Sequence, residues 1–169
     1  GAPRGAVLTF KGMELRISGV LFASWQYLID TPAPSGTNSD NAFDMNRAYV
    51  NVEPHVSQHI WLRITPDLVR VRNDDGSLNG SLALRLKYAY AQFDEGLPGL
   101  SIKVGMQHTA YIDYEESIWR YRVLGPSGYE TFTRMSSADI GLAVLGTIPG
   151  GLLAYQVVVS NGEGYQEPE

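Results

Sequence analysis

Six basic residues of this sequence stand at positions where a row of positive charge can form. Most of them have an apolar residue on either side in the chain. Because successive side chains of a β-strand point to opposite faces, this spacing places the basic side chains on one face, away from the apolar ones. Rows of Arg and Lys favour the passage of anions where they line a pore. The six residues are Arg16, Arg47, Arg63, Arg85, Lys87 and Lys103.

The same basic residues have a plainer interpretation. Acidic residues follow a similar alternation in neighbouring segments, so cations and carboxylates can pair across strands and simply fill a polar surface. The acidic candidates are Glu14, Glu53, Asp67 and Asp139. The sequence leaves both interpretations open, and pairing is the one that we favour.

A second basic group lies in the stretch 108–137, beside aromatic residues. Arg120 and Arg122 stand two residues apart next to Trp119, and Arg134 follows later in the stretch. Since a guanidinium group can bind a carboxylate or phosphate with two parallel hydrogen bonds, these residues can contact an anion or a sugar. They can equally anchor the stretch to a wall through its acidic residues, which we favour slightly. These acidic residues are Asp113, Glu115, Glu116 and Glu130.

Other signatures of chemistry are missing from the sequence. It contains no Cys, which excludes thiolate catalysis and Cys-based zinc sites. His55, His59 and His108 stand singly, without further metal-ligating residues at a suitable spacing. There is no nucleophile elbow, no Gly-rich phosphate loop and no defensible pair of catalytic carboxylates. The net charge of −5 does not suggest nucleic-acid binding. We therefore expect no enzyme activity, no cofactor and no metal.

The segments that must position these side chains read as long β-strands. Seven segments alternate apolar and polar residues with period two, or have the composition of strands. None of comparable length shows helical periodicity. Strands of soluble proteins usually run about 5–6 residues, whereas strands that cross a bilayer need about 9–11. The seven segments are 13–27, 42–54, 60–67, 82–91, 102–107, 138–148 and 153–160.

The connections between these segments fall into two classes that alternate strictly. Membrane barrels have this asymmetry, because their periplasmic turns are short and their extracellular loops are free to lengthen. A soluble sandwich has no general reason to place every long loop at one end. The short turns are 54–58, 94–99 and 149–151, and the long loops are 31–40, 72–80 and 108–137.

Several large aromatic residues are expected on the apolar faces of these strands. Tyr and Trp suit a boundary between apolar and wet surroundings, so the group can form an aromatic girdle at a membrane interface. Packing in an ordinary core is the alternative. The residues are Trp25, Tyr27, Tyr88, Tyr90 and Tyr155.

The sequence resembles the porin O and P family, the phosphate-selective porins of the Gram-negative outer membrane. The likeness spans most of the chain, in the stretches 47–50, 86–90, 99–105, 137–143 and 155–165. The resemblance implies an antiparallel transmembrane β-barrel of about sixteen strands, normally a homotrimer. It also implies a third extracellular loop that folds into the lumen, which here is the stretch 108–137.

Two departures from the family shape the expectation. Seven strands are about half of such a barrel, and the sequence lacks a terminal aromatic strand, so we expect residues 1–169 to be the N-terminal portion of a single barrel domain. The basic residues of the stretch 108–137 are diluted by acidic ones, whereas the phosphate-selective branch has closely spaced Arg and Lys at its constriction.

The sequence therefore predicts an outer-membrane porin that lets small hydrophilic solutes or anions diffuse passively through a water-filled barrel. Its expected partners are outer-membrane lipid, the diffusing solutes and further copies of itself. Two other functions stay open: a soluble, secreted β-sandwich that binds carbohydrate, and a structural barrel subunit of an envelope assembly.

Overall fold

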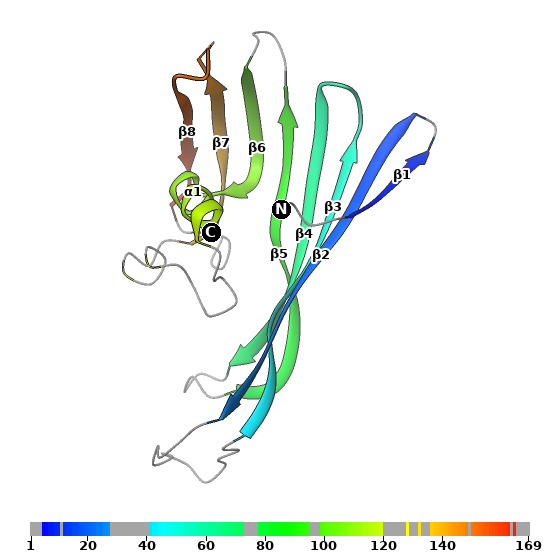
Figure 1. Cartoon of the computed structure of the whole chain (residues 1–169), viewed down its shortest axis with the longest axis vertical. Coiled ribbons are helices and arrows are strands. Elements are labelled where there is room, and N and C mark those ends of the chain that lie inside the picture. Colours follow the sequence, from blue (N-terminus) through cyan, green and yellow to red (C-terminus); the bar gives the residue numbers. More distant parts are fainter. Residues whose placement is uncertain are drawn as a thin grey trace.

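A computed structural model of the chain describes residues 5–10, 12–27, 41–72, 78–94, 99–119, 128, 132, 136–148, 150–162 and 164. Within this part of the chain, eight β-strands form one antiparallel sheet, and each strand pairs with its neighbours in sequence (Figure 1). The helix α1 (Ala110–Ile118) lies in the connection between β6 and β7. The strands are β1 (Ala6–Phe10), β2 (Met13–Tyr27), β3 (Asn41–His55), β4 (Ile60–Arg72), β5 (Leu78–Phe93), β6 (Leu100–His108), β7 (Ala138–Thr147) and β8 (Ala154–Ser160).

The expected all-β, antiparallel architecture is confirmed. The sheet is open: β1 and β8 are its outer strands, and they do not pair with each other. The sequence predicted seven strands and missed β1. This strand has only five residues, and its sequence AVLTF does not alternate, although it pairs in register with β2 from Ala6 opposite Ile17 to Phe10 opposite Met13.

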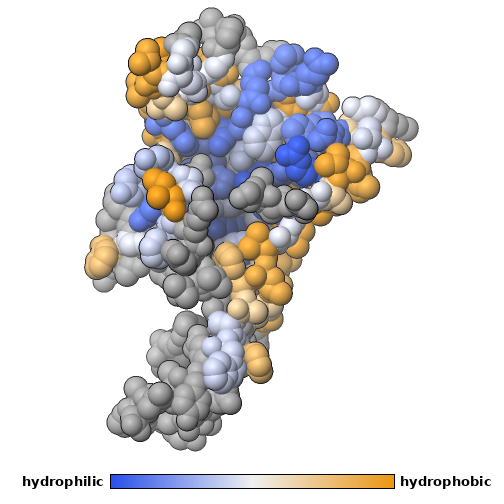
Figure 2. Space-filling view, in the orientation of Figure 1, coloured by the Kyte–Doolittle hydropathy of each residue, from blue (hydrophilic) through white to orange (hydrophobic). Residues whose placement is uncertain are grey.

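The two faces of the sheet differ sharply in chemistry. Cross-strand pairs place like with like, such as Ser18 opposite Asn51 and Ile17 opposite Val52. We call one face the polar face; its buried residues include Asn51, Thr65, Asp67, Lys87, Lys103 and Gln107. We call the other the apolar face; its exposed residues include Leu21, Trp25, Phe43, Val50, Ile64, Leu84, Ile102, Val104, Leu142, Val157 and Val159. Figure 2 shows hydrophilic residues gathered over the upper part of the sheet and hydrophobic residues along the side of β1 and β2.

A break in the ladder between β4 and β5 changes which residues of β5 share a face. Thr65 pairs with Tyr88, whereas the next residue, Pro66, pairs with Leu86, so Lys87 is an extra residue in β5. Proline has no N–H group to give to the ladder and is found in sheets mainly at edges and bulges. The prediction that Tyr88 lies on the apolar face is therefore wrong, because the bulge turns this side chain to the polar face.

Tyr90 follows Tyr88 onto the polar face for the same reason. The two rings are only 4% and 5% exposed, so they cannot belong to an interfacial girdle on the other face. Trp25 and Tyr155 lie on the apolar face as expected, opposite Phe43 and Gly146 respectively. The side chain of Tyr27 lies outside the described residues.

The connections are only partly as predicted. The connections after β2 and β6 span residues 28–40 and 109–137 and are long, as expected. The predicted long loop 72–80 is wrong, because β4 continues to Arg72 and β5 already begins at Leu78. The strict alternation of short and long connections therefore does not hold at this point.

Helix α1 is the element that the sequence did not suggest. Its N-cap residue, Thr109, makes no side-chain capping bond, and no basic residue stands in its last turn. The Thr109 hydroxyl instead donates to the backbone oxygen of Ser136, tying the two ends of the connection together. None of the helices in the described residues has the length and apolar character needed to cross a membrane.

Candidate functional site

Three cations gather around two buried tyrosines at the centre of the polar face. The guanidinium carbon of Arg63, from β4, lies 4.9 Å from the ring centre of Tyr88. The Lys87 ammonium lies 5.1 Å from the same ring centre, and the Lys103 ammonium lies 5.2 Å from that of Tyr90. The negative faces of aromatic rings attract such cations. We call these five residues the central cluster.

Arg63 is held in place by polar side chains of β3 and β4. Its Nε atom donates to the Thr65 hydroxyl over 3.1 Å, and its Nη2 atom donates to Asn51 Oδ1 over 2.9 Å. The Glu53 carboxylate lies 3.7 Å away. Neutral partners therefore orient the guanidinium, while one carboxylate balances part of its charge.

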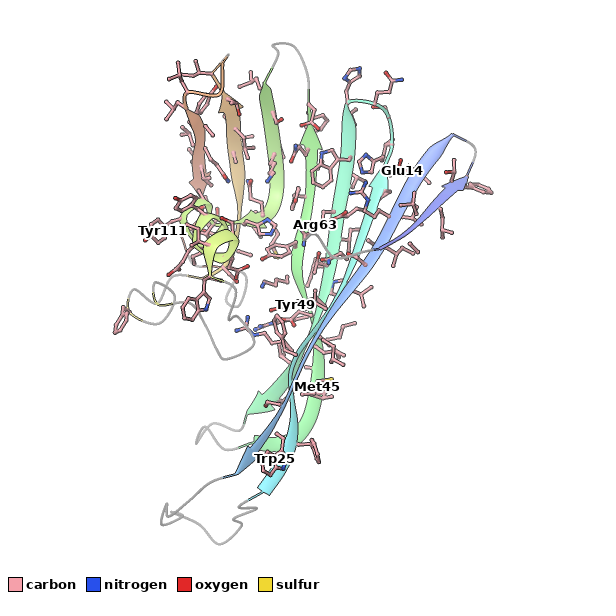
Figure 3. All side chains as sticks on the ribbon, viewed as in Figure 1. Glu14, Trp25, Met45, Tyr49, Arg63 and Tyr111 are labelled. Carbon is pink, nitrogen blue, oxygen red and sulfur yellow. The ribbon has the colours of Figure 1, made fainter. Side chains whose placement is uncertain are left out.

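Lys87 and Arg47 both use the hydroxyl of Tyr49. The Lys87 ammonium donates to this oxygen over 3.3 Å, and Arg47 Nη1 donates to it over 3.0 Å. The Lys87 ammonium also lies 4.5 Å from the Tyr49 ring centre. Tyr49 and Arg63 project to the side of the sheet on which α1 lies (Figure 3).

The remaining two basic residues are paired with acids. Both Nε and Nη2 of Arg85 donate to Asp67 Oδ2, over 3.0 and 2.9 Å, and Asp67 is fully buried. Arg16 donates to Glu14 over 3.4 Å, and both side chains are nearly half exposed. Coulombic attraction counts for more at the first pair because water screens the second.

His108 packs against both tyrosines of the central cluster. Its ring stacks on Tyr88 at 3.9 Å between ring centres, and its edge meets Tyr90 at 6.1 Å. Three residues earlier in β6, Gly105 faces Tyr90 across the ladder at a φ of +120°. An added Cβ there would collide with the carbonyl oxygen of Ala89, so β6 can approach β5 closely only because this residue is glycine.

The structure places all six predicted cations on one face, as the alternation indicated. The favoured pairing with acids across neighbouring strands accounts for Arg85 and in part for Arg63, whereas Arg16 pairs with Glu14 of its own strand. Asp139, a further predicted partner, instead accepts hydrogen bonds from the backbone N–H groups of Ile140 and Gly162.

Of the second predicted group, in the stretch 108–137, the structure describes only Trp119. Trp119 follows α1 and is 42% exposed, while Arg120, Arg122 and Arg134 lie outside the described residues. The prediction that these three residues contact an anion or sugar at a constriction therefore stays a prediction.

The sequence did not single out several residues that the structure adds to the site. Asn51 and Tyr49 alternate with Val50 and Val52 in β3, so the period-two pattern already placed them on the polar face. Tyr88 and His108 could not be found in this way, because their positions depend on the bulge at Lys87 and on the pairing of β5 with β6.

A second polar cluster surrounds Asp94 in the turn between β5 and β6. The carboxylate accepts hydrogen bonds from Ser101 Oγ and Gln92 Nε2, each over 2.6 Å, and from Trp61 Nε1 over 3.2 Å. Burial raises the pKa of this carboxyl, but the three hydrogen bonds and the charge of Lys103 outweigh it, so the pKa lies below its ordinary value of 3.8. The carboxylate is therefore ionised at neutral pH and joins β4, β5 and β6.

Within the described residues, no group of three or more His, Asp or Glu side chains is placed to hold a metal ion. No family model, curated protein or solved structure matches the chain. What the molecule does must therefore be argued from its two faces and from the clusters on the polar one.

Proposed function

We propose that this chain forms part of the wall of an outer-membrane porin, with its apolar face in contact with lipid and its polar face lining a water-filled pore. Small hydrophilic solutes or anions diffuse through the pore without chemical change. The proposal agrees with the resemblance to the porin O and P family. In this arrangement further strands complete the barrel, and three copies associate.

The observation that supports the proposal most strongly is the reversed distribution of polarity across the sheet. Leu84 is 70% exposed and Val159 is 72% exposed on the apolar face, whereas Asp67 and Lys87 on the polar face are 0% and 3% exposed. Exposed apolar surface costs about 25 cal/mol per Å² in water and nothing comparable in hydrocarbon. Membrane barrels have this alternation, with apolar residues outward and polar residues inward.

The length of the strands agrees with the same proposal. β2, β3 and β5 have 15, 15 and 16 residues, which exceeds the roughly 9–11 residues that a tilted strand needs to cross a bilayer. A carbohydrate-binding β-sandwich would cover the apolar face with a second sheet. All eight described strands belong to one sheet, so nothing in the described part of the chain favours that alternative.

The charges of the polar face favour a weak preference for anions. The central cluster contributes three cations to this face, and the Glu53 carboxylate lies 3.7 Å from one of them, Arg63. Elsewhere on the face, Arg85 and Arg16 are neutralised by Asp67 and Glu14. Cation rings and rows select anions in pores, but such a mixed face selects only modestly.

The connection between β6 and β7 supplies the part that narrows the pore in this proposal. α1 lies on the polar side of the sheet, where it shares a cavity with Ser101 and Gln156. A helix on the lumen side reduces the width of the water-filled space. We therefore include α1 as one part of the proposed constriction, which spans residues 108–137.

Conductance across planar lipid bilayers tests the proposal. The purified complete protein should form stable ohmic channels whose reversal potential in a salt gradient shows a weak preference for chloride over potassium. Replacing Lys87 and Lys103 with Gln should move the reversal potential towards cation preference, because it removes two of the three charges of the central cluster. Arg16→Gln is the matched control, and its effect should be smaller because Glu14 already offsets that charge.

Two results would contradict the proposal. A protein that inserts into the bilayer but shows no conductance would not be a porin. Channels whose selectivity is unchanged by the Lys87 and Lys103 replacements would show that the central cluster does not face the conducting path.

A further inference from the structure

Two adjoining cavities lie between α1 and the polar face of β6, β7 and β8. The larger has a volume of about 700 Å³, and the smaller has a volume of about 310 Å³. Ala110 and Tyr111 line both, so the cavities meet at the start of α1. Small-molecule sites usually have volumes of about 300–1,000 Å³, so either cavity can hold a small solute.

Buried amide groups in these cavities have hydrogen-bonding capacity that no described residue uses. Gln107 is 1% exposed and lines the smaller cavity, yet neither its Nε2 nor its Oε1 atom has a hydrogen-bond partner. Gln156 lines the larger cavity, and its Nε2 atom is also buried without a partner. Buried polar groups in proteins are nearly always satisfied, so these amides call for a polar occupant.

The chemistry of the lining favours an uncharged occupant. No Lys or Arg among the described residues lines either cavity. Asp139 lines the smaller cavity, but its two oxygens already accept hydrogen bonds from the backbone N–H groups of Ile140 and Gly162. An amide can donate to and accept from the same hydroxyl-bearing molecule, whereas it offers an anion no balancing charge.

Tyrosine rings supply an apolar surface beside these amides. Tyr111 and Tyr114 line the larger cavity from α1 and are 52% and 66% exposed. Figure 3 shows Tyr111 on the helix, at the side of the sheet where β7 and β8 lie. Exposed aromatic rings can pack against the C–H face of a sugar ring while leaving its hydroxyls free for the amides.

We propose that the two cavities form a binding site for a neutral saccharide of one or two rings, with Gln107 and Gln156 bonding its hydroxyls and Tyr114 packing against a ring. The site rests on the proposed porin function only for the route by which the sugar arrives. It deepens that function by giving the pore a preferred class of uncharged solute beside its weak preference for anions.

Ligand-detected saturation-transfer NMR on the full chain, in a detergent without a sugar headgroup, tests this site directly. Maltose and glucose should both receive saturation from the protein, and glucose should bind at least as tightly as glucose 6-phosphate. Gln156→Leu should weaken maltose binding about three- to tenfold, because it removes one hydrogen-bond donor.

A second variant tests the site without changing a buried residue, so that a loss of binding is not caused by misfolding. Tyr114→Ala changes an exposed side chain on α1 and should also weaken maltose binding about threefold or more. Val157→Leu, on the opposite face of β8, and Ile118→Ala, on α1 outside both cavities, are the matched controls and should leave binding unchanged.

The outcomes separate this inference from the proposed function. Absence of saturation transfer to either neutral sugar, tighter binding of glucose 6-phosphate, or equal binding by the variants and the wild type would overturn the saccharide site, even if the protein conducts ions. Sugar binding by a protein that forms no channels would instead overturn the porin proposal and leave the saccharide site standing.

Discussion

The Asp67 carboxylate is completely buried on the polar face, and Arg85 is the basic residue that pairs with it. Arg85 donates to the same carboxylate oxygen from two nitrogen atoms, while the other oxygen, Oδ1, is buried without a hydrogen-bond partner. A buried charge is costly unless it is paired, so removing the partner has a larger effect than the pair's net contribution. The pair therefore matters more for keeping this part of the sheet folded than for conduction.

Replacing Arg85 with Met should lower the free energy of unfolding by about 3 kcal/mol, because it leaves the Asp67 carboxylate buried and unpaired. Urea titration in lipid vesicles, followed by tryptophan fluorescence, measures this. Arg16→Met is the control and should cost less than about 1 kcal/mol, since its partner Glu14 is half exposed. Equal effects of the two replacements would show that water reaches Asp67 as easily as Glu14.

Asp94 makes stability depend on pH at the acid end. Its pKa in the folded protein lies below the ordinary value of 3.8, so the folded state favours the ionised form. This contribution is fully present above about pH 4 and is lost as the pH falls through the lowered pKa. Asp94→Asn should lower the melting temperature at pH 7, and the difference from the wild type should shrink as the pH approaches 3.

Melting curves by circular dichroism between pH 3 and pH 7 check this expectation. A difference between Asp94→Asn and the wild type that stays constant over the whole range would show that the charge of Asp94 does not contribute.

Among the secondary-structure elements, β5 and β6 determine how the central cluster forms. The bulge at Lys87 brings Tyr88 and Tyr90 onto the polar face, and the glycine at position 105 lets β6 approach β5 beside them. The tyrosines then form the surface over which Arg63 and Lys103 lie. Two backbone irregularities, rather than the regular ladder, thus assemble the cluster.

Gly105→Ala should destabilise the protein by about 2 kcal/mol or more, since the new Cβ collides with the Ala89 carbonyl and the residue keeps a φ of +120°. Chemical unfolding in vesicles measures the loss. Gly19→Ala in β2 is the control: its Cβ would lie 3.3 Å from the nearest atom, the Tyr49 carbonyl oxygen, and its φ is not positive. A Gly105→Ala variant as stable as Gly19→Ala would contradict the close approach of β6 to β5.

The sequence was sufficient to predict a strand where apolar and polar residues alternate over a long segment. Residues 13–27 were predicted as a strand, and β2 has these same limits, because alternation extends along the segment with Val20 and Phe22 as its two exceptions. β1 was missed because its five residues do not alternate, and α1 was missed because its nine residues are too few for a helical period to stand out. The shared face of the six cations was predictable, but the partners of Arg63 and Lys87 depend on contacts between distant segments, which period-two alternation alone does not encode.

At the scale of the whole molecule, the sheet exposes its apolar face and buries much of its polar face, which is the reverse of a sheet in a soluble protein. The apolar face extends across the sheet from Leu21 in β2 to Val159 in β8, and both residues are exposed. Continuous apolar surface of this extent marks a membrane or protein contact. The lipid contact that we propose predicts that charge on this face is costly only in a bilayer.

Leu84→Arg distinguishes the two environments. At a site that is 70% exposed, such a change in water should alter stability by less than about 0.5 kcal/mol. On the lipid face of a barrel it should cost about 2–4 kcal/mol near the bilayer midplane. Unfolding in lipid vesicles gives the value, and Gln58→Arg in the exposed turn between β3 and β4 should be neutral. A neutral Leu84→Arg in vesicles would place the apolar face outside the bilayer.

The most direct test of the account is the environment of alternate residues in lipid vesicles. The chain has no Cys, so one Cys can be introduced at a time and labelled with a nitroxide. The positions to replace are Leu82, Ala83, Leu84, Val157, Val158 and Val159. Collision with oxygen, which concentrates in hydrocarbon, should be high at Leu82, Leu84, Val157 and Val159. Collision with a water-soluble nickel chelate should be high at Ala83, and at Val158, which lines the smaller cavity beside α1, collision with oxygen should be low. Equal access of the nickel chelate to all six positions would contradict the claim that the two faces meet lipid and water.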